Sequence, residues 1–344
     1  MKVKLGDLTK IKTGKLDANA SSEDGQYPFF TCSREPLKIS NYSYDCECVL
    51  VAGNGDLNVK YYNGKFDAYQ RTYIIEDNGS GKLYMPYLYY FMEGYIEELR
   101  KQAIGGVIKY IKLGNLTDAL IELPSVDEQK SIVEILVKAK GILEKRNDEL
   151  NALDNLIKAR FVEMFGDPGT NPMGWKETTI GEECFYIKDG PHKSLPDIGR
   201  ENGGHPFISV RNIVDGYIDF STAKYISDED YADAIKKCHP KKGDMLYSKG
   251  GTTGIAKLID VDVEFANWVH VAVLKFDKKK LNGVFFENML NGVYCYEQSQ
   301  RLTKGIANRD LVLSAMAQIK MYRPPMELQQ QFAAFVAQVT KSKF

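Results

Sequence analysis

Residues 124–165 have the sequence PSVDEQKSIVEILVKAKGILEKRNDELNALDNLIKARFVEMF. The segment begins with Ser125-Val126-Asp127-Glu128, a capping box in which the serine and glutamate side chains satisfy free backbone amides at a helix start. Seam positions of a coiled coil then recur in alternating steps of four and three residues: Ile132, Leu136, Ala139, Leu143, Arg146, Leu150, Leu153 and Ile157. We therefore predict a coiled-coil helix over residues 125–165, roughly 60 Å long at a rise of 1.5 Å per residue.

An amphipathic helix lying on a globular core is the alternative interpretation of this segment. Such a helix would show a broader apolar stripe and a shorter run, whereas the seam persists for about four heptads. Arg146 is the one charged seam residue, and we expect it to fix the register of pairing at some cost in stability. The segment GDPGTNPMGW that follows Phe165 is rich in glycine and proline, so we predict a linker over residues 166–174.

A second helix start appears at residues 324–329, where PPMELQ repeats the pattern of PSVDEQ at residues 124–129. Leu328 stands where the first copy has Glu128, which weakens the second cap. The sequence ends at Phe344, so we expect this helix to have about half the length of the first and to be truncated. Its apolar face continues the seam pattern through Leu328, Phe332, Phe335 and Val339.

The regions before and after the first helix are two diverged copies of each other. Leu5-Gly6-Asp7 matches Ile180-Gly181-Glu182, and the run VLVAGNG at residues 49–55 parallels MLYSKGG at residues 245–251. Further matches join residues 27–30 to 205–208, 66–70 to 264–268, and 105–124 to 305–324. The offset rises along the chain from 175 to 178, 196, 198 and 200 residues. A steady rise is what insertions in the second copy would produce, so we predict two related domains.

Both copies are predicted to be mixed domains rich in strands. Short runs of β-branched and aromatic residues alternate with Gly, Asn and Asp, and helices are expected over residues 85–103 and 227–237. The predicted fold class is α+β. We expect the first domain at residues 1–124, the first helix at 125–165, the linker at 166–174, the second domain at 175–324, and the second helix at 325–344.

Composition limits the classes of function. A net charge of -1 excludes a uniformly basic DNA-coating protein, so any phosphate contacts must be local or completed by a partner chain. The six cysteines show no paired C-x-x-C spacing and only four histidines are present, so we expect reduced thiols and no metal site. No apolar run approaches the roughly 18 residues of a membrane span, and MKVKLGDLTK is too polar for a signal peptide. We expect a cytoplasmic protein.

The motifs PSVDEQKSIVEIL and RFVEMFGDPGTNPMGW, in their order along the chain, resemble the specificity subunits of Type I restriction-modification systems. The resemblance covers essentially the whole chain. It implies two target recognition domains in tandem, each reading one half of a bipartite, asymmetric DNA site. It also implies that the two helices pack antiparallel, set the spacing of the half-sites and dock methyltransferase subunits, with restriction subunits able to join.

The same resemblance implies a subunit that carries out no catalysis and holds no cofactor. S-adenosylmethionine and ATP would belong to the partner subunits. Consistent with this, the sequence contains no Asn-Pro-Pro-Tyr motif, no convincing nuclease carboxylate cluster and no phosphate-binding loop.

Candidate DNA contacts are side chains that can reach base edges, above all Arg or Lys for guanine and Asn or Gln for adenine. They concentrate in the glycine-rich turns and the strands that follow them. In the first domain we select Asn54, Asn58, Lys60, Lys65, Tyr69, Gln70, Arg71 and Lys109. In the second domain we select Lys188, His192, Lys193, Arg211, Asn212, Ser248, Lys249, Thr252, Thr253, Asn267, Trp268 and Arg309. Lys109 and Arg309 coincide at the repeat offset. The alternative for Asn54, Thr252 and Thr253 is that they only stabilise turns.

Two other functions remain open at this point. The chain could be an accessory recognition chain of another restriction-methylation enzyme, or a scaffold whose coiled coil carries two protein-binding domains. We also expect that the isolated chain self-associates or needs methyltransferase subunits, because apolar seam positions would otherwise face water.

Overall fold

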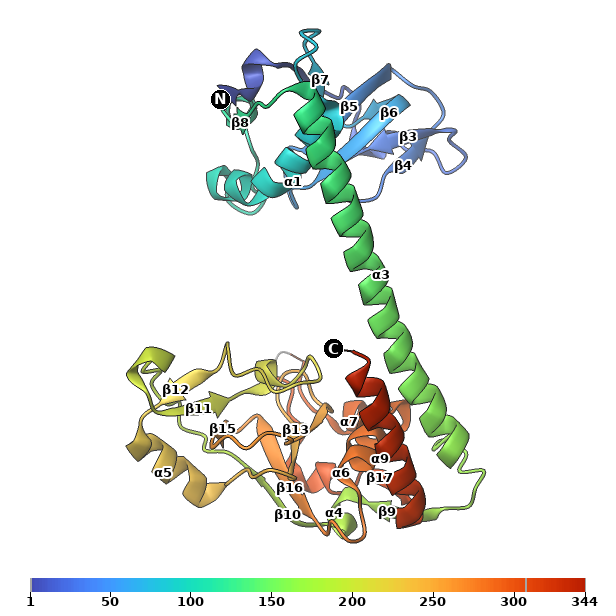
Figure 1. Cartoon of the computed structure of the whole chain (residues 1–344), viewed down its shortest axis with the longest axis vertical. Coiled ribbons are helices and arrows are strands. Elements are labelled where there is room, and N and C mark those ends of the chain that lie inside the picture. The colour runs from blue at the N-terminus through green and yellow to red at the C-terminus, as the bar shows by residue number, and fades with distance from the viewer. Residues whose placement is uncertain (1, 307, 344) are drawn as a thin grey trace. The chain divides into compact units, whose positions relative to one another are not determined.

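The computed structural model describes residues 2–306 and 308–343, and it divides into two compact units, Met1–Arg146 and Asn147–Phe344. Helix α3 (Val126–Phe165) is continuous and contributes to both (Figure 1). It confirms the helix that the sequence predicts over residues 125–165. The capping box is present, because Ser125 and Glu128 bond reciprocally through side chain and backbone.

The first unit is built on one six-stranded sheet, flanked by a small two-stranded sheet. The order in the large sheet is β2 (Thr9–Thr13), β7 (Thr72–Asp77), β5 (Tyr44–Ala52), β6 (Val59–Ala68), β3 (Tyr27–Phe30) and β4 (Leu37–Ile39). Neighbouring strands are antiparallel except β3 and β6, which are parallel. β1 (Lys2–Lys4) pairs with β8 (Leu120–Glu122). The remaining elements are η1 (Leu5–Asp7), η2 (Ala18–Ala20), α1 (Met85–Gln102) and α2 (Leu113–Thr117).

Side-chain alternation along β5 gives the sheet of the first unit two apolar faces. Val49 and Val51 pack in the same core as the buried face of α1, whereas Cys48 and Leu50 belong to a separate core on the other side with Phe66. Helix α1 matches the helix predicted over residues 85–103 to within one residue. Pro86 stands in its first turn, where a missing amide costs no hydrogen bond.

The second unit divides the same strand arrangement between two sheets. One contains, in order, β10 (Cys184–Asp189), β16 (Val271–Phe276), β13 (Met245–Ser248) and β14 (Ala256–Leu258), and the other contains β12 (Lys224–Ile226), β11 (His205–Ile208) and β15 (Ala266–Asn267). β9 (Lys176–Thr179) pairs with β17 (Lys320–Arg323). The helical elements are α4 (Ile180–Glu183), η3 (Arg200–Asn202), η4 (Val210–Asn212), α5 (Asp228–Lys237), α6 (Gly283–Asn291), α7 (Val293–Leu302), α8 (Leu313–Met316) and α9 (Met326–Lys341). Helix α5, capped by Ser227, confirms the helix predicted at residues 227–237.

Equivalent backbone bonds confirm the internal repeat and correct one of its offsets. The Tyr69 amide donates to the Phe30 carbonyl at 2.9 Å, and the Trp268 amide donates to the Ile208 carbonyl at 2.9 Å. Tyr69 therefore corresponds to Trp268, an offset of 199 residues, so the predicted pairing of residues 66–70 with 264–268 was wrong by one position. At the predicted offset of 198, FDAYQ and EFANW align an alanine with an alanine, which made this register look correct. At the observed offset of 199, Phe66 aligns with Phe265.

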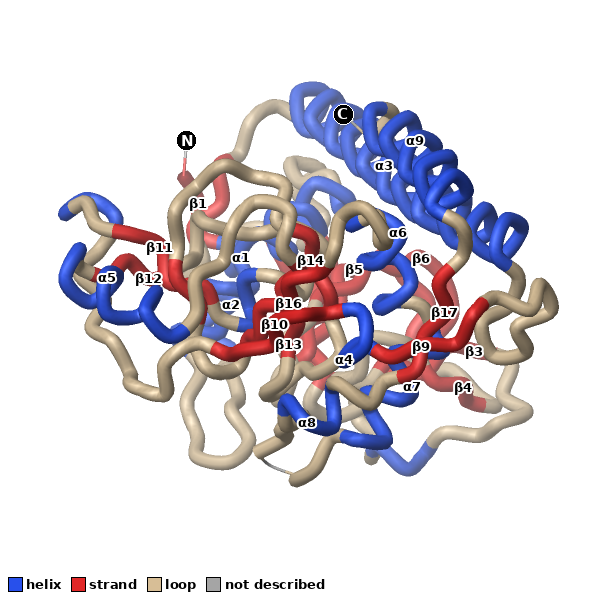
Figure 2. The backbone as a smooth tube through the Cα atoms, turned by 90° about the horizontal axis from the view of Figure 1, so that it is seen from below, coloured by secondary structure: helices blue, strands red, loops and turns tan. Residues whose placement is uncertain are grey.

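Helices α3 and α9 pack side by side and antiparallel within the second unit, as Figures 1 and 2 both show. Phe332 at the start of α9 contacts Phe165 and Phe161, whereas Lys343 after its end pairs with Asp154. Of the predicted pairing residues, the cluster along this contact contains Leu153, Ile157, Leu328, Phe332, Phe335 and Val339. Phe161 and Phe165 extend the contact beyond Ile157, the last seam residue that the sequence predicted.

The earlier part of the seam has a different environment. Ile132, Leu136 and Leu143 are exposed, the last by 70%, and Ala139 is exposed as well. Arg146 and Leu150 are half-buried. That seam residues 132–143 pair with another helix therefore stays a prediction, and that helix would have to come from a further chain.

The cysteines of the chain are thiols with raised pKa values where they are buried. All six cysteines are free, and burial raises the pKa of Cys238 to about 11 and of Cys295 to about 12. Within residues 2–306 and 308–343, no three His, Cys, Asp or Glu side chains gather as a metal site would require. The helices of the same residues include none with the length and apolar character of a membrane span.

Candidate nucleic-acid interface

A glycine turn at residues 53–55 lies at the end of β5 and joins three segments of the first unit. The Gly53 amide donates to the Arg71 carbonyl at 2.8 Å, and the Gly53 carbonyl accepts from the Ile111 amide at 2.9 Å. The Gly55 amide donates to the Lys109 carbonyl at 2.9 Å. A Cβ on Gly53 would lie 2.3 Å from the Arg71 oxygen, so the close approach requires glycine. We call residues 53–58 together with the loop 104–111 the first turn site.

The second unit repeats this arrangement at residues 249–254 and 304–311, which we call the second turn site. The Lys249 amide donates to the His270 carbonyl at 2.8 Å, and its carbonyl accepts from the Leu311 amide at 2.7 Å. The Gly251 amide donates to the Arg309 carbonyl at 3.0 Å. The two sites therefore share one set of main-chain bonds, while the side chains on that frame differ between the copies.

In the first unit the structure brings together four of the predicted contact residues. Asn54 lies in the turn beside Tyr110, Lys109 is exposed on the adjoining loop, and Arg71 and Gln70 are exposed on the segment that the turn binds. The Gln70 side chain also donates to Asp17 at 2.7 Å, so it must leave this partner to bond a base. Tyr69 is half-buried next to them. These side chains can reach a ligand that lies against the first turn site.

The other predicted residues of the first unit have local roles. The Asn58 side chain donates to the Cys32 and Asp56 carbonyls, each at 2.8 Å, and thereby holds the turn in place. Lys60 bonds to the Asn58 side chain, and burial lowers its pKa. Lys65 lies on β6, with its ammonium 4.8 Å from the centre of the Tyr42 ring. We therefore do not retain Asn58, Lys60 or Lys65 among the proposed contacts.

One carboxylate lies within the first turn site, and its charge is compensated there. Asp56 accepts from Arg34 at 3.2 Å and from Arg100 at 3.1 Å. The hydrogen bond from Arg34 is the main cause that lowers the pKa of Asp56. The site therefore presents Lys109 and Arg71 without an uncompensated negative charge from Asp56.

Five predicted residues of the second unit are used inside the protein, and for these the prediction needs correction. All five are nearly inaccessible to solvent: Asn212, Ser248, Lys249, Thr253 and Asn267. The Asn267 amide group donates to the Val271 carbonyl, the Ser248 hydroxyl accepts from the Ile255 amide, and Asn212 bonds to Ser209 at the start of η4. The Thr253 hydroxyl lies 2.9 Å from that of Thr303. Buried polar groups with protein partners are not free to bond base edges.

The Lys249 side chain is buried and forms ion pairs with two carboxylates. Its ammonium lies 2.8 Å from Asp310 and 3.6 Å from Asp189, and its side chain is only 7% exposed. Thr252 is exposed in the same turn, and Arg309 is half-buried and donates to the Gln300 side chain. Thr252 and Arg309 therefore remain the accessible predicted residues of the second turn site.

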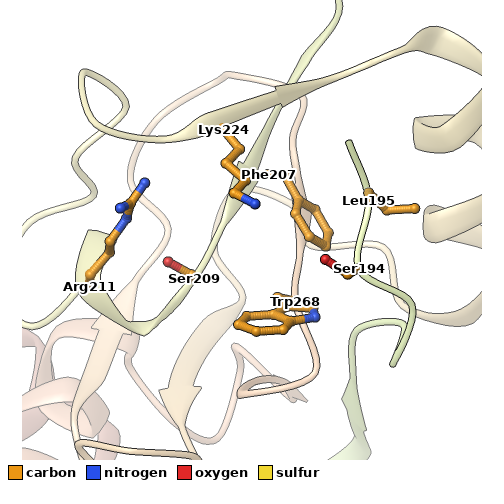
Figure 3. A pocket seen from close by; sticks show the side chains of 7 residues that line it. All are labelled: Ser194, Leu195, Phe207, Ser209, Arg211, Lys224 and Trp268. Carbon is orange, nitrogen blue, oxygen red and sulfur yellow. The ribbon is translucent and has the colours of Figure 1, made fainter. Parts of the chain in front are cut away.

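A cavity of about 200 Å³ lies beside Trp268 in the second unit (Figure 3). The Trp268 and Phe207 rings form apolar walls, and the Arg211 and Lys224 side chains project toward the same space from other segments. The Trp268 indole nitrogen has no hydrogen-bond partner among the described residues. The cavity thus combines an aromatic surface with two cations, a combination suited to stacking and to bonding a base or a phosphate. Its remaining lining residues are Ser194, Leu195 and Ser209.

Sequence reasoning found Arg211 and Trp268 but missed Lys224, Phe207 and the two serines of this cavity. Lys224 reaches it because β12 pairs with β11, so that Lys224 lies opposite Phe207. In the first unit Leu37 lies opposite Phe29 in the equivalent pair of strands. The repeat therefore gives no cation at this position in the first unit, and the two units present different chemistry.

The remaining predicted residues of the second unit lie on neighbouring surface. Lys188 is exposed on β10, with its ammonium 5.3 Å from the centre of the Tyr186 ring. His192 and Lys193 are exposed on the segment that leads to Leu195, and Lys193 lies 3.7 Å from Asp230. His192 and Lys193 thus lie on the same segment as Ser194 and Leu195, which line the cavity.

Comparisons with known proteins agree with this architecture. A family model described as the Type I restriction modification DNA specificity domain matches residues 1–152 and 172–344. The EcoDI specificity subunit of a Type I restriction enzyme from Escherichia coli is 42% identical over 219 residues, which is 61% of this chain and 48% of that protein. The match thus spans about half the length of that relative. The MjaVIII specificity subunit of Methanocaldococcus jannaschii is 22% identical over 358 residues, 96% of this chain and 84% of that protein.

Solved structures show the same fold at low sequence identity. The S subunit of the Type I restriction-modification system from M. genitalium superposes with a TM-score of 0.61 at 16% identity, covering 100% of this chain and 90% of that chain. A chain from a study of complex assembly and conformational transition of the type I R-M system gives a TM-score of 0.51, also at 16% identity and with the same coverage. With two matched segments separated by the end of α3 and the linker, the chain belongs to the family of Type I restriction modification DNA specificity domains and carries two of them in tandem.

Proposed function

We propose that this chain is the DNA-recognition subunit of a Type I restriction-modification complex, in which each unit reads one half of a bipartite, asymmetric site. The observation that carries the proposal is the pair of turn sites, which share their main-chain bonds and differ in their side chains. Two domains that recognise different DNA sequences can share one backbone arrangement, but they need different side chains on it. The net charge of -1 is compatible with this role, because Arg211 and Lys224 line one cavity, and exposed Arg71 and Lys109 lie on segments that bond to the same turn.

The proposed contacts differ between the units. In the first unit they are Asn54, Tyr69, Gln70, Arg71 and Lys109. In the second unit they are Lys188, His192, Lys193, Arg211, Lys224, Thr252, Trp268 and Arg309. Arg and Lys favour guanine, and Asn and Gln favour adenine, so the second unit is better equipped for guanine than for adenine.

The long helix has a different role in this proposal. The exposed apolar stretch of α3, which includes Ile132, Leu136 and Leu143, would be covered by methyltransferase subunits or by a second copy of the chain. We infer that this chain performs no chemistry and that S-adenosylmethionine and ATP act in its partners. Restriction subunits would join the same assembly in the cytoplasm.

Methylation mapping tests the independence of the two readers. The chain is co-expressed with a methyltransferase subunit of a Type I system that binds it, and methylated adenines are located genome-wide for the wild type, Arg71→Ala and Arg211→Ala. Because each arginine belongs to one unit, Arg71→Ala should relax one half-site and Arg211→Ala the other, with a loss of discrimination of about 1–3 kcal/mol at the affected base. Equal loss at both halves in either variant would contradict independent reading, and a complex that binds no DNA would contradict the proposed function.

A further inference from the structure

The loops of the two turn sites carry apolar side chains that touch little of the protein. Val107 in the first unit and Ile306 in the second are completely exposed, and Ile108 is 62% exposed. Isolated apolar residues on a surface are common, but here each of the two corresponding loops carries one directly after its glycine, although not at the same repeat position, because Ile306 aligns with Gly106. Their occurrence in both copies indicates that the tips meet a ligand.

Each loop is a closed hairpin rather than a free segment. Ile104 and Tyr110 exchange backbone bonds at 3.0 and 2.8 Å, and Lys304 and Asp310 exchange bonds at 2.9 Å each. Gly105 and Gly305 have φ values of +118° and +86°, which only glycine adopts without strain. Because each loop also bonds to its glycine turn, the apolar tip is held at a fixed place beside the proposed DNA contacts.

The charges around the tips favour nucleic acid over an apolar protein surface. The segment KQAIGGVIKYIK at residues 101–112 contains three lysines and no acidic residue. In the second unit the segment 301–310 contains Arg301, Lys304 and Arg309, and its one acidic residue, Asp310, is paired with Lys249. The major groove of DNA is wide enough to admit a two-stranded β-ribbon, and each of these loops is closed by a single bridged pair of residues, so it can enter the same groove.

The thymine methyl is the apolar group that base edges present in the major groove. Resting on the proposed function, we propose that Val107 with Ile108, and Ile306 in the second unit, contact thymine methyl groups, so that each half-site contains a thymine read by its hairpin tip. Such a contact distinguishes thymine from cytosine without a hydrogen bond. The hairpin tips would thus be specificity-determining elements distinct from the polar residues of the turn sites.

Replacing single thymines by deoxyuridine tests this contact, because the exchange removes only the methyl group. The assembled complex is titrated with duplexes that carry its mapped target and one thymine-to-deoxyuridine exchange at a time. For the wild type, one exchange in each half-site should weaken binding about fourfold, the effect of burying one methyl group. Val107→Ser should reduce the sensitivity in its half-site, where Ile108 remains, and Ile306→Ser should abolish it in the other.

Matched variants separate this contact from a general loss of binding. Val107→Thr keeps one methyl group at the tip and should keep most of the sensitivity to deoxyuridine. Leu120→Ser alters another exposed apolar residue of the first unit, on β8, and should leave the sensitivity unchanged. Insensitivity of the wild type at every thymine would overturn the inference, as would equal sensitivity in Val107→Ser.

The tips could instead bind a methyltransferase subunit, and assembly without DNA decides between the two. If Val107→Ser or Ile306→Ser weakens assembly in the absence of DNA, the thymine contact is wrong. The proposed function is judged separately by the methylation map. A complex that reads both half-sites but ignores the thymine methyls refutes only this inference.

Discussion

Lys249 and Asp189 form the centre of a small buried ion network in the second unit. Asp189 is 2.7 Å from Lys237 and 3.6 Å from Lys249, and Lys249 also binds Asp310 at 2.8 Å. A buried carboxylate that loses a cation is left with a desolvated charge, which destabilises the folded state strongly. The network therefore holds the second turn site against β10, and Lys249 serves structure rather than DNA contact.

Replacing Lys249 by methionine should lower the free energy of unfolding of the second unit by about 3 kcal/mol. The reason is that Asp189 keeps only Lys237 as a partner. Denaturant unfolding of the full chain measures the change. Lys236→Met, which alters a lysine 75% exposed on α5, should change the stability by less than about 0.5 kcal/mol. A changed second half-site without lost stability would restore Lys249 as a direct reader.

Asp219 gives a second residue-scale prediction, which concerns pH. Hydrogen bonds from Ser221 and Thr222 lower the pKa of Asp219 from 3.8 to about 2. A lowered pKa in the folded state means that the bonds stabilise this loop fully above pH about 4 and are lost as the pH falls toward 2. Because the Thr222 carbonyl also accepts from Arg211 at 2.6 Å, the loop positions a proposed DNA contact.

An NMR titration of the Ser221 amide should therefore show a midpoint near pH 2 in the wild type. In Asp219→Asn this titration should disappear, and the Arg211 guanidinium should become more mobile. A midpoint at the ordinary value of 3.8 would show that the hydrogen bonds do not favour the ionised carboxylate.

Residue types alone could not separate exposed contacts from buried structural residues. Asn54 and Asn267 look equivalent in sequence as possible adenine readers, yet Asn54 lies in an open turn and Asn267 is 1% exposed. The difference arises from strand pairing, because β15 lies beside β11 inside the unit. Lys224 escaped prediction for the same reason. Pairing between strands distant in sequence decides these positions, and no local pattern encodes it.

Gln129 and Gln329 occupy the same position of the motif shared by the starts of α3 and α9, and they make equivalent hydrogen bonds. The buried Gln129 side chain accepts from the Tyr84 amide at 2.8 Å and donates to the Lys82 and Pro124 carbonyls at 2.8 and 2.9 Å. Gln329 makes the equivalent bonds to Asn282, Lys280 and Pro324. Each glutamine thus fastens a helix start to the segment that leads into a preceding helix, α1 or α6.

Changing Gln129 to glutamate should destabilise the first unit by about 2 kcal/mol. A carboxylate can accept from the Tyr84 amide, but it cannot donate to the two carbonyls. Hydrogen exchange at the Tyr84 amide and denaturant unfolding measure the effect. The control is Glu134→Gln on the exposed surface of α3, which should be neutral. Unchanged stability in Gln129→Glu would mean that water replaces the lost donor.

The helices were the elements that sequence predicted best. The capping box, the helix over residues 125–165 and the apolar face of α9 follow from local spacing, and the structure confirms them. The seam prediction ended too early, at Ile157. Phe161 and Phe165 continue the packing because α6 supplies Phe285 as an additional partner, and heptad spacing alone does not anticipate a third helix.

At the scale of the whole molecule, one helix belongs to both compact units. The boundary between the units falls after Arg146, inside α3, and no break in the helix marks it. A continuous helix has a fixed rise per residue, so the proposed spacing between half-sites should depend on the length of α3. The sequence predicts this element, but it does not predict which bases each unit reads, because that depends on how individual side chains meet DNA.

Inserting one heptad after Leu143 should lengthen the spacer between the half-sites by about three base pairs. Seven residues add about 10.5 Å at 1.5 Å per residue, and each base pair occupies about 3.4 Å. Methylation mapping of the variant gives the spacer directly. An insertion of the same length in the exposed turn between Gly79 and Gly81 should leave the spacer unchanged. An unaltered spacer in the helix variant would show that α3 does not set the distance.

The main-chain frame of the turn sites has a consequence for how this protein can change over time. Backbone bonds hold residues 54, 71 and 109 in position whatever their side chains are, so substitutions there cost little folding stability. If the chain reads DNA as proposed, point mutations at these positions should change the preferred sequence while the fold is kept. Under the proposed function, a lineage could thus change which DNA sites the complex marks through a series of folded variants of this chain.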